Sequence, residues 1–259
     1  MMEMGIDGPE KPTAGVKISS ARKPQKPLFW ESVKFSFSRL AAILAPMIIT
    51  YHGGQFVKIS HGDTVIAANP FGKNGAYKPI RFGARIGLIS VNHPDYNGIE
   101  NLSHGEKVPF AITGPGEYEV GGIAVSGFMA TKGFGPDGLL NTIYAVELEG
   151  IRLCFLGALS VPDLTSEQVE GIGEVDILFV PIAGGDLLSP ADAEKIAVSL
   201  DAKLIIPIAW SSAADPQLKL FLKESGAEGT AVLDKLTLKK KDLEGKEGEV
   251  ALLEPLAHA

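Results

Sequence analysis

The strongest constraint on the fold is a change in the pattern of apolar residues along the chain. From Met47 onward, the short apolar runs MIITYH, QFVKIS and DTVIAAN follow one another with glycine-containing turns between them. From Leu164 onward, apolar runs alternate with capped amphipathic segments. The first pattern is typical of a meander of short strands, and the second predicts strands separated by helices. Two sheets packed together with helices outside would bury both sets of apolar faces, so we expect an α/β fold of this kind.

Helix-start signals mark three segments of the second half. In LTSEQVEGIG, Thr165 or Ser166 stands where a helix would begin. Ser189 precedes a proline in SPADAEKIAVSL, and Asp215 precedes a proline in DPQLKLFLKESG. Capping side chains followed by proline or glutamine are common at helix starts. The continuous apolar runs VDILFVPI and KLIIPIAW between these segments predict buried central strands.

Further strands are expected around these elements. ARIGLISVNH predicts a buried strand, VPFAITGPGEYEVGGIAVSGFMA two or three strands, and NTIYAVELEG with IRLCFLG a hairpin that turns at Glu149 and Gly150. In GPGEYEV we expect Gly116 to need unusual backbone angles, with Glu117 and Tyr118 belonging to a turn. TAVLDKLTLKKKDL and EVALLEP are expected as closing strands.

The N-terminal part differs in composition from the rest. Residues 1–27 are rich in Gly, Pro, Lys and Ser and show no apolar period, which predicts a disordered tail. Residues 28–46 predict an amphipathic helix or a linker, because Glu31, Lys34 and Arg39 interrupt the apolar residues. We therefore place the folded domain at 47–259, and we expect no membrane-spanning helix.

Charge and cysteine content narrow the classes of partner. The formal net charge is -7, which argues against a nucleic-acid-binding surface. The short basic run Lys239, Lys240 and Lys241 is soon followed by acidic residues and is expected at a solvated edge. Cys154 is the one cysteine, and its apolar surroundings predict a buried side chain in a cytoplasmic protein.

The stretch SVNHPDYNG, residues 90–98, contains the candidate functional residues. His93, Asp95 and Tyr96 follow an apolar run, and closely spaced His and Asp after a strand are typical of metal hydrolases. However, Val91 and Tyr96 occupy positions where further histidines would be useful ligands. His93, Asp95 and Tyr96 are thus the candidates for catalysis, and His93 and Asp95 the weak candidates for binding a metal such as zinc.

Several segments in chain order resemble the metallo-β-lactamase fold superfamily, and within it the Zn-dependent hydrolases similar to ascorbate-6-phosphate lactonase. They are ITYHGGQFVKI, TVIAANPFG, ISVNHPDYNG, ITGPGEYEVGGIAVSG, NTIYAVELEGIRLCFLGALS, VDILFVPIAGG, SPADAEKI and LIIPIAW. The resemblance covers about Met47 to Trp210. It implies a four-layer α/β-β/α sandwich of two mixed β-sheets flanked by helices, with metals at one edge.

The resemblance also implies where metal ligands would stand, and most of these positions hold other residues. His93 and Asp95 match the His-x-His-x-Asp-His motif, whereas Val91 and Tyr96 replace its first and last histidines. The remaining positions fall at Asn69, near Thr131 or Lys132, at Phe155 and Ala158, and at Ala209 or, with a shift of one residue, Trp210. A dinuclear site needs five or six converging ligands, so we expect no standard two-zinc site.

Three functions follow from these observations. The first is a metal-depleted, non-catalytic binding or scaffold module, forming a homo-oligomer, with an unknown small molecule or protein as partner. The second is a metal-dependent hydrolase of a phosphorylated or cyclic ester, with a remodelled site around His93 and Asp95. The third is an unrelated α/β binding protein. We favour the first, because apolar residues at the ligand positions can fill the space of lost metals and imidazoles.

Overall fold

The computed structural model describes residues 45–106 and 108–256. The predicted tail at 1–27 lies outside these residues, as does nearly all of the predicted helix or linker at 28–46, so both stay predictions. The first strand begins at Met47.

The first sheet has six strands in the order β13-β1-β2-β3-β4-β5. Strands β13, β1, β2 and β3 pair antiparallel, and β3, β4 and β5 pair parallel, so the sheet is mixed. The strands are β1 (Met47–Tyr51), β2 (Val57–His61), β3 (Thr64–Ala68), β4 (Ile86–Leu88), β5 (Phe110–Ile112) and β13 (Leu236–Leu238). The expected meander is therefore β1 to β3, whereas the strand predicted to reach the candidate loop ends at Leu88.

The second sheet has seven strands in the order β14-β11-β10-β9-β8-β7-β6. They are β6 (Gly116–Val120), β7 (Ile123–Met129), β8 (Thr142–Leu148), β9 (Ile151–Phe155), β10 (Ile177–Pro181), β11 (Leu204–Ile208) and β14 (Glu249–Val250). The predicted hairpin joins β8 to β9, and Glu149 and Gly150 at its tip both have positive φ, 52° and 73°. Two central residues with positive φ define the turn whose twist matches antiparallel strands.

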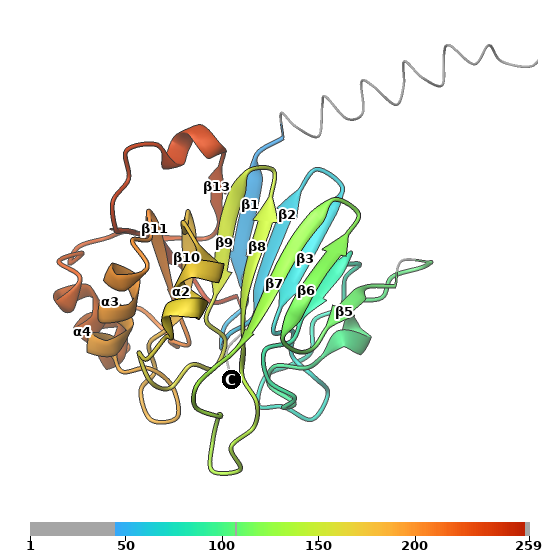
Figure 1. Cartoon of the computed structure of the whole chain (residues 1–259), viewed down its shortest axis with the longest axis horizontal. Helices are drawn as coiled ribbons and strands as arrows, with labels where there is room; N and C mark the ends of the chain where they lie inside the picture. The colour runs from blue at the N-terminus through green and yellow to red at the C-terminus, as the bar shows by residue number, and fades with distance from the viewer. Residues whose placement is uncertain (1–44, 107, 257–259) are drawn as a thin grey trace, which may run out of the picture. The chain divides into compact units, whose positions relative to one another are not determined.

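The two sheets pack face to face around the main core. Alternate side chains of the first sheet, such as Ile49, Ile59 and Ile66, are fully buried together with residues from every central strand of the second sheet. Figure 1 shows the blue strands β1 to β3 behind the green and yellow strands β7 to β9. The predicted sandwich of two mixed sheets is confirmed.

Three helices accompany the second sheet. They are α2 (Ser166–Ile172), α3 (Pro190–Ser199) and α4 (Pro216–Glu224), and they begin at the predicted caps Thr165, Ser189 and Asp215. Helix α2 packs on β7, and α3 packs on both β10 and α4. None of the described helices has the length and apolar character needed to cross a membrane.

A loop covers the outer face of the first sheet. Val65 and Ala67 of β3 point away from the main core and pack in a second cluster. That cluster is completed by the connection between β3 and β4 and by the short 3-10 helix η1 (Ile99–Asn101), which supply Phe71, Tyr77, Ile80, Phe82, Ala84, Ile99 and Leu102. Within the described residues, this layer is made without an α-helix.

The C-terminal region is less regular than predicted. TAVLDKLTLKKKDL holds β12 (Val232–Leu233), β13 and the 3-10 helix η2 (Lys240–Leu243), so the prediction of a strand across the lysines was wrong. EVALLEP forms β14 and β15 (Leu252–Leu253), and β15 pairs parallel with β12. The alternation of apolar and polar residues in this segment could not show that the Leu243 side chain would point into the core, where it is 1% exposed.

Candidate functional site

The loop of residues 89–98, which contains the candidate motif, is anchored by buried polar side chains. Asn69, at the end of β3, accepts hydrogen bonds through Oδ1 from the backbone N–H and the hydroxyl of Ser90, both at 2.9 Å. The Tyr144 hydroxyl donates to the Ile89 carbonyl at 2.8 Å. Asn69 has φ of 51°, a conformation that asparagine tolerates better than most residues. These bonds fix the start of the loop against both sheets.

The connection after β9 is tied to the same place. Asn141 donates through Nδ2 to the Leu156 carbonyl at 3.0 Å and accepts through Oδ1 from the Ala158 N–H at 2.8 Å. Gly157 has φ of 59°, and a Cβ there would lie 2.4 Å from Asn141 Oδ1 and 2.6 Å from Ser90 Cβ. Only glycine fits this approach. The strand ends therefore meet at one edge, as a metal site of this fold would require.

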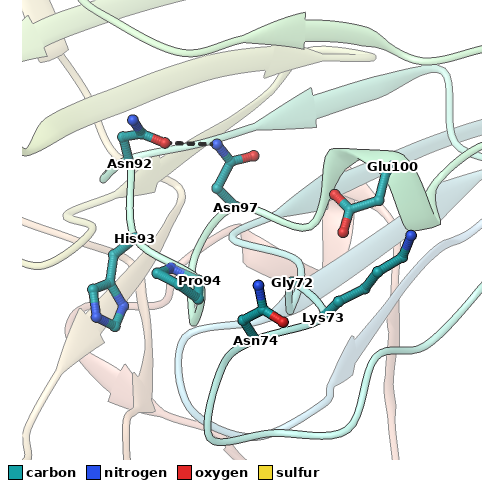
Figure 2. Close-up of a pocket in the computed structure, with 8 residues that line it drawn as sticks. All are labelled: Gly72, Lys73, Asn74, Asn92, His93, Pro94, Asn97 and Glu100. Atoms are coloured by element: carbon teal, nitrogen blue, oxygen red, sulfur yellow. Dashed lines mark hydrogen bonds between the residues drawn. The ribbon is translucent and has the colours of Figure 1, made fainter.

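His93 and Asp95 lie close together but line different hollows. His93 Nδ1 is 3.8 Å from Asp95 Oδ2 and accepts a hydrogen bond from the Asp95 N–H at 3.2 Å. The His93 side chain, 39% exposed, borders a surface hollow of about 260 Å³. Its other walls are Gly72, Lys73, Asn74, Asn92, Pro94, Asn97 and Glu100 (Figure 2).

Asp95 and Tyr96 line a second cavity, of about 180 Å³. Its other walls are Gly54, Gln55, Tyr77, Ala183, Leu187 and Ala209. Asp95 accepts the Ala76 N–H through Oδ1 at 2.5 Å. Tyr96 is 7% exposed, and burial followed by the nearby Asp95 charge raises the pKa of its hydroxyl. The loop thus directs His93 and Asp95, the two candidate metal ligands, towards different hollows.

The positions of the lost ligands Val91, Tyr96 and Ala158 form one apolar cluster. Val91 is 1% exposed and Ala158 is fully buried. Phe134, Leu139 and Leu187 pack against them, and the rings of Tyr96 and Phe134 meet edge to face at 5.3 Å. We call these six residues the plug. Side chains without strong donor atoms fill the place where the resemblance puts histidine and aspartate.

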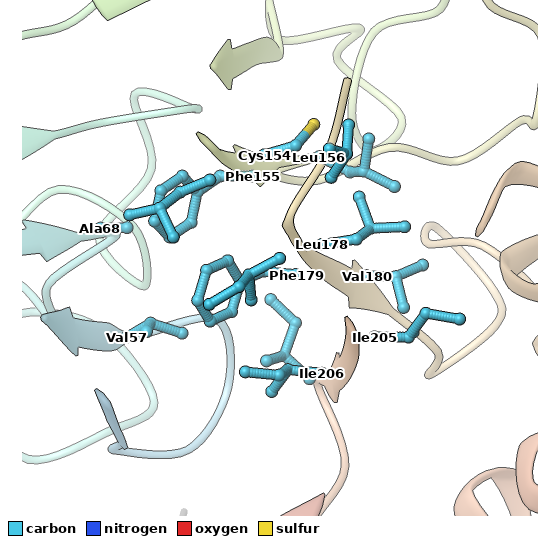
Figure 3. Packing of buried hydrophobic residues seen from close by; sticks show 14 of the residues in the cluster. Val57, Ala68, Cys154, Phe155, Leu156, Leu178, Phe179, Val180, Ile205 and Ile206 are labelled. Carbon is cyan, nitrogen blue, oxygen red and sulfur yellow. The ribbon is translucent and has the colours of Figure 1, made fainter. Parts of the chain in front are cut away.

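Phe155, at another ligand position, belongs to the main core. Its ring stacks on Phe179 at 4.5 Å with an interplanar angle of 4° (Figure 3). Neighbouring Cys154 is fully buried, and burial raises the pKa of its thiol to about 12, so the predicted inert apolar role is confirmed. A phenyl ring in this packing leaves the position no capacity to bind a metal.

At the last ligand position, backbone hydrogen bonds hold Ala209 at the wall of the cavity beside Asp95, whereas Trp210 is packed in the core. Ala209 has φ of 63°, and its N–H donates to the Gly54 carbonyl at 2.7 Å and to the Tyr51 hydroxyl oxygen at 2.9 Å. Trp210 is 3% exposed and donates through Nε1 to the Pro207 carbonyl at 2.8 Å. Its role is core packing.

The donor set does not fit a two-metal centre. Across residues 45–106 and 108–256, no group of three or more His, Cys, Asp or Glu side chains lies together as a metal site requires. Thr131, near another expected ligand, donates its hydroxyl to the Asp163 carbonyl at 3.1 Å. His52 stacks on Phe56 at 4.6 Å, and burial, with a smaller effect of Lys58, lowers its pKa to about 4.

The segment GPGEYEV, which the sequence analysis singled out, has a structural role. Gly116 has φ of 142°, as expected, but the prediction that Glu117 and Tyr118 belong to a turn was wrong, because both lie in strand β6. Glu117 accepts the Ser126 hydroxyl at 2.7 Å, and Tyr118 donates to the Gly114 carbonyl at 3.0 Å. These bonds stay within the β6–β7 region.

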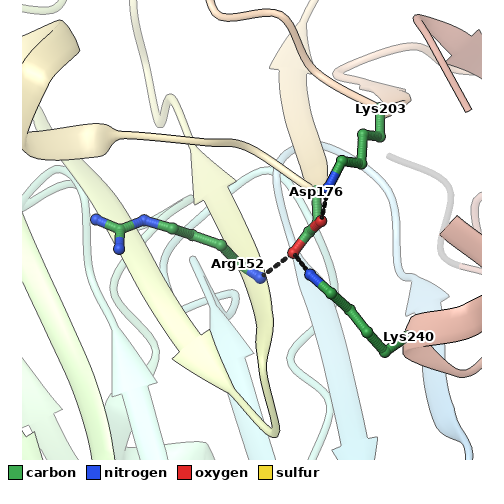
Figure 4. Close-up of polar contacts among 4 residues, drawn as sticks. All are labelled: Arg152, Asp176, Lys203 and Lys240. Atoms are coloured by element: carbon green, nitrogen blue, oxygen red, sulfur yellow. Dashed lines mark hydrogen bonds and ion pairs between the residues drawn. The ribbon is translucent and has the colours of Figure 1, made fainter. Parts of the chain in front are cut away.

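The lysine run is exposed, as predicted, and one of its members also pairs with a buried carboxylate. Lys240 Nζ is 2.6 Å from Asp176 Oδ2, and the Asp176 side chain is 3% exposed (Figure 4). Asp176 also pairs with Lys203 at 2.8 Å and accepts the Arg152 backbone N–H at 2.8 Å. Burial would raise the pKa of Asp176, but these hydrogen bonds outweigh it and lower the pKa.

Sequence reasoning missed Gln55 and Tyr77 as residues of the cavity. Gln55 follows a glycine turn and Tyr77 lies in the connection between β3 and β4, far from the motif in sequence. No motif marks either residue, since the approach of these two segments to Asp95 is a tertiary feature.

The fold and this edge of the sandwich define a metallo-β-lactamase-type protein. The family model of the β-lactamase superfamily domain matches residues 48–209, and the chain belongs to this superfamily. A search of curated proteins finds no match.

Solved structures agree with this assignment. A Thermotoga maritima protein assigned as a Zn-dependent hydrolase of the metallo-β-lactamase superfamily is 29% identical, with a TM-score of 0.65, covering 80% of this chain and 98% of that one. The metallo hydrolase Igni18 of Ignicoccus hospitalis is 15% identical, with a TM-score of 0.54 and coverages of 81% and 96%. The diiron β-hydroxylase CmlA of Streptomyces venezuelae is 14% identical, with a TM-score of 0.54 and coverages of 83% and 54%. The last two show the fold alone, and the likeness to ascorbate-6-phosphate lactonase stays a prediction.

Proposed function

We propose that this protein is a non-catalytic member of its superfamily, in which the two-metal hydrolase site has become a binding or scaffold module. The observation that carries this proposal is the plug. Val91, Tyr96 and Ala158 stand at three ligand positions and are buried against one another, with Phe134, Leu139 and Leu187 around them.

The energetics support a coordinated loss. A metal ion in this place would have to give up its water ligands, and two candidate donors, His93 and Asp95, cannot replace a full coordination shell. The scaffold made by Asn69, Ser90, Asn141 and Gly157 persists, so the edge of the sandwich keeps its shape without ligands.

Metal analysis tests the proposal. The full chain is purified without chelator, incubated with zinc, passed through a desalting column and measured by inductively coupled plasma mass spectrometry. The Thermotoga maritima relative, treated in parallel, controls for metal loss during handling. We expect substoichiometric zinc in this protein. Stoichiometric zinc would refute the proposal, and turnover of phosphorylated or cyclic esters by that zinc-bound protein would support the alternative function.

The alternative function is a metal-dependent hydrolase with a remodelled site around His93 and Asp95. The 3.8 Å approach of His93 Nδ1 to Asp95 Oδ2 favours it. In that case His93→Ala should abolish a turnover of phosphorylated or cyclic esters that added metal stimulates, while Glu100→Gln, which changes another wall of the same hollow, should leave it intact.

The proposed module forms a homo-oligomer in the cytoplasm and binds neither nucleic acid nor membrane. An open edge supports self-association: β5 pairs on one side with β4, and Val108 and Phe110 are 76% and 51% exposed there. The buried free thiol of Cys154 is compatible with a reducing compartment. Light scattering after size-exclusion chromatography should give a multiple of the chain mass, reduced by Phe110→Lys.

A further inference from the structure

We propose that the cavity between Gln55, Tyr77, Asp95 and Tyr96 binds a small organic cation that carries N–H donors, such as an amidinium or a primary ammonium compound. This inference rests on the proposed function, because it requires that the former metal edge serve as a binding pocket.

The first argument is the size and composition of the cavity. Its volume of about 180 Å³ equals that of about six water molecules at roughly 30 Å³ each. Ala183, Leu187 and Ala209 supply apolar walls, and Asp95 and two tyrosines supply polar groups. Apolar walls with a few convergent polar groups are characteristic of small-molecule sites.

The second argument is unused hydrogen-bonding capacity. Gln55 is 3% exposed, and its amide atoms Oε1 and Nε2 are closed off from solvent, so Gln55 forms a wall of the cavity without presenting a polar atom to it. Asp95 uses Oδ1 for the Ala76 N–H, and its Oδ2 has His93 Nδ1 no nearer than 3.8 Å. An N–H donor in the cavity could satisfy this second carboxylate oxygen.

The third argument is the sign of the local charge. The lining contains Asp95 and no lysine or arginine. A negative field disfavours phosphate and carboxylate ligands and favours a cation, which the tyrosine rings can also accommodate.

The two hollows beside the loop differ in this respect. The His93 hollow is lined by both Lys73 and Glu100, so it carries side chains of opposite charge (Figure 2). The Asp95 cavity combines one unopposed carboxylate with apolar walls. Only the second therefore selects by charge.

The test compares three probes of one shape: benzamidine, which is cationic, benzamide, which is neutral, and benzoate, which is anionic. Binding to the full-length protein is measured by isothermal titration calorimetry, and the site is mapped by NMR chemical-shift changes. We expect benzamidine to bind more tightly than benzamide, and benzoate not to bind. Asp95→Asn, which keeps the Oδ1 acceptor for Ala76, should weaken benzamidine about tenfold or more, since a hydrogen bond to a charged group is lost.

Glu100→Gln removes a carboxylate from the other hollow and should leave benzamidine affinity unchanged. Equal binding of benzamidine and benzoate, no binding of benzamidine, or unchanged affinity in a folded Asp95→Asn variant would overturn the inference. If this inference alone fails, the metal analysis still finds substoichiometric zinc. Failure of the proposed function instead appears as stoichiometric zinc in the metal analysis.

Discussion

Val91→His tests whether the plug has truly replaced the metal site. Val91 is 1% exposed, and its neighbours Tyr96 and Ala158 are 7% and 0% exposed, so a larger imidazole has little free space. Among the six plug residues, the Tyr96 hydroxyl is the one polar side-chain group and there is no carboxylate, so at least one ring nitrogen of the new histidine would lose its water without a side-chain replacement from the plug.

The magnitude follows from two contributions. An unpartnered buried polar group costs roughly 1–3 kcal/mol, and overpacking a closed site costs roughly 1–3 kcal/mol more. We expect a loss of about 3 kcal/mol in the free energy of unfolding, because the plug borders the Asp95 cavity and can relax partly towards it. With an m-value of about 2 kcal/mol/M, the urea midpoint falls by about 1.5 M.

The assay is urea unfolding followed by circular dichroism, with and without zinc. Val198→His is the matched control, because Val198 is 68% exposed on α3 and the change there should stay within about 0.5 kcal/mol. A loss at residue 91 no larger than that of the control, or a midpoint of Val91→His that zinc restores, would refute the reasoning. The second result would mean that the other ligands of a metal site are still in place.

Three further predictions concern stability. Asp176→Asn should lower the free energy of unfolding by about 3 kcal/mol at neutral pH, because the charge paired with Lys240 is lost. The folded pKa of Asp176 is depressed, so its contribution is present above the unfolded pKa of about 3.9 and disappears as pH falls through the folded value. Urea titrations at several pH values should therefore show the two proteins converging in acid, and a constant gap would contradict this assignment. His52 has a folded pKa lowered from 6.5 to about 4, so stability should decline between these values as pH falls, by about 3 kcal/mol in all, and His52→Phe should flatten that decline. Asn141→Ala should cost about 2–3 kcal/mol in the same unfolding assay, because the Ala158 N–H and Leu156 carbonyl lose buried partners, and a neutral result would show that other groups hold this connection.

Much of the fold could be predicted from local patterns. The capping residues Thr165, Ser189 and Asp215 and the Glu149–Gly150 turn depend on neighbours within a few residues, so the sequence alone located them. The failures came where distant contacts decide. The segment after Leu238 leaves its strand and forms a 3-10 helix, in which Lys240 pairs with Asp176, 64 positions away in the chain.

By itself, the sequence determined the superfamily fold and the replacement of most ligand residues, because side-chain identity and apolar period are written residue by residue. It could not determine what fills the vacated site. The tertiary structure brought Val91 and Ala158 together with Phe134, Leu139 and Leu187, and placed Gln55 and Tyr77 beside Asp95. Close packing and cavity formation depend on segments far apart in the chain, so whether a lost site closes or becomes a pocket is decided in three dimensions.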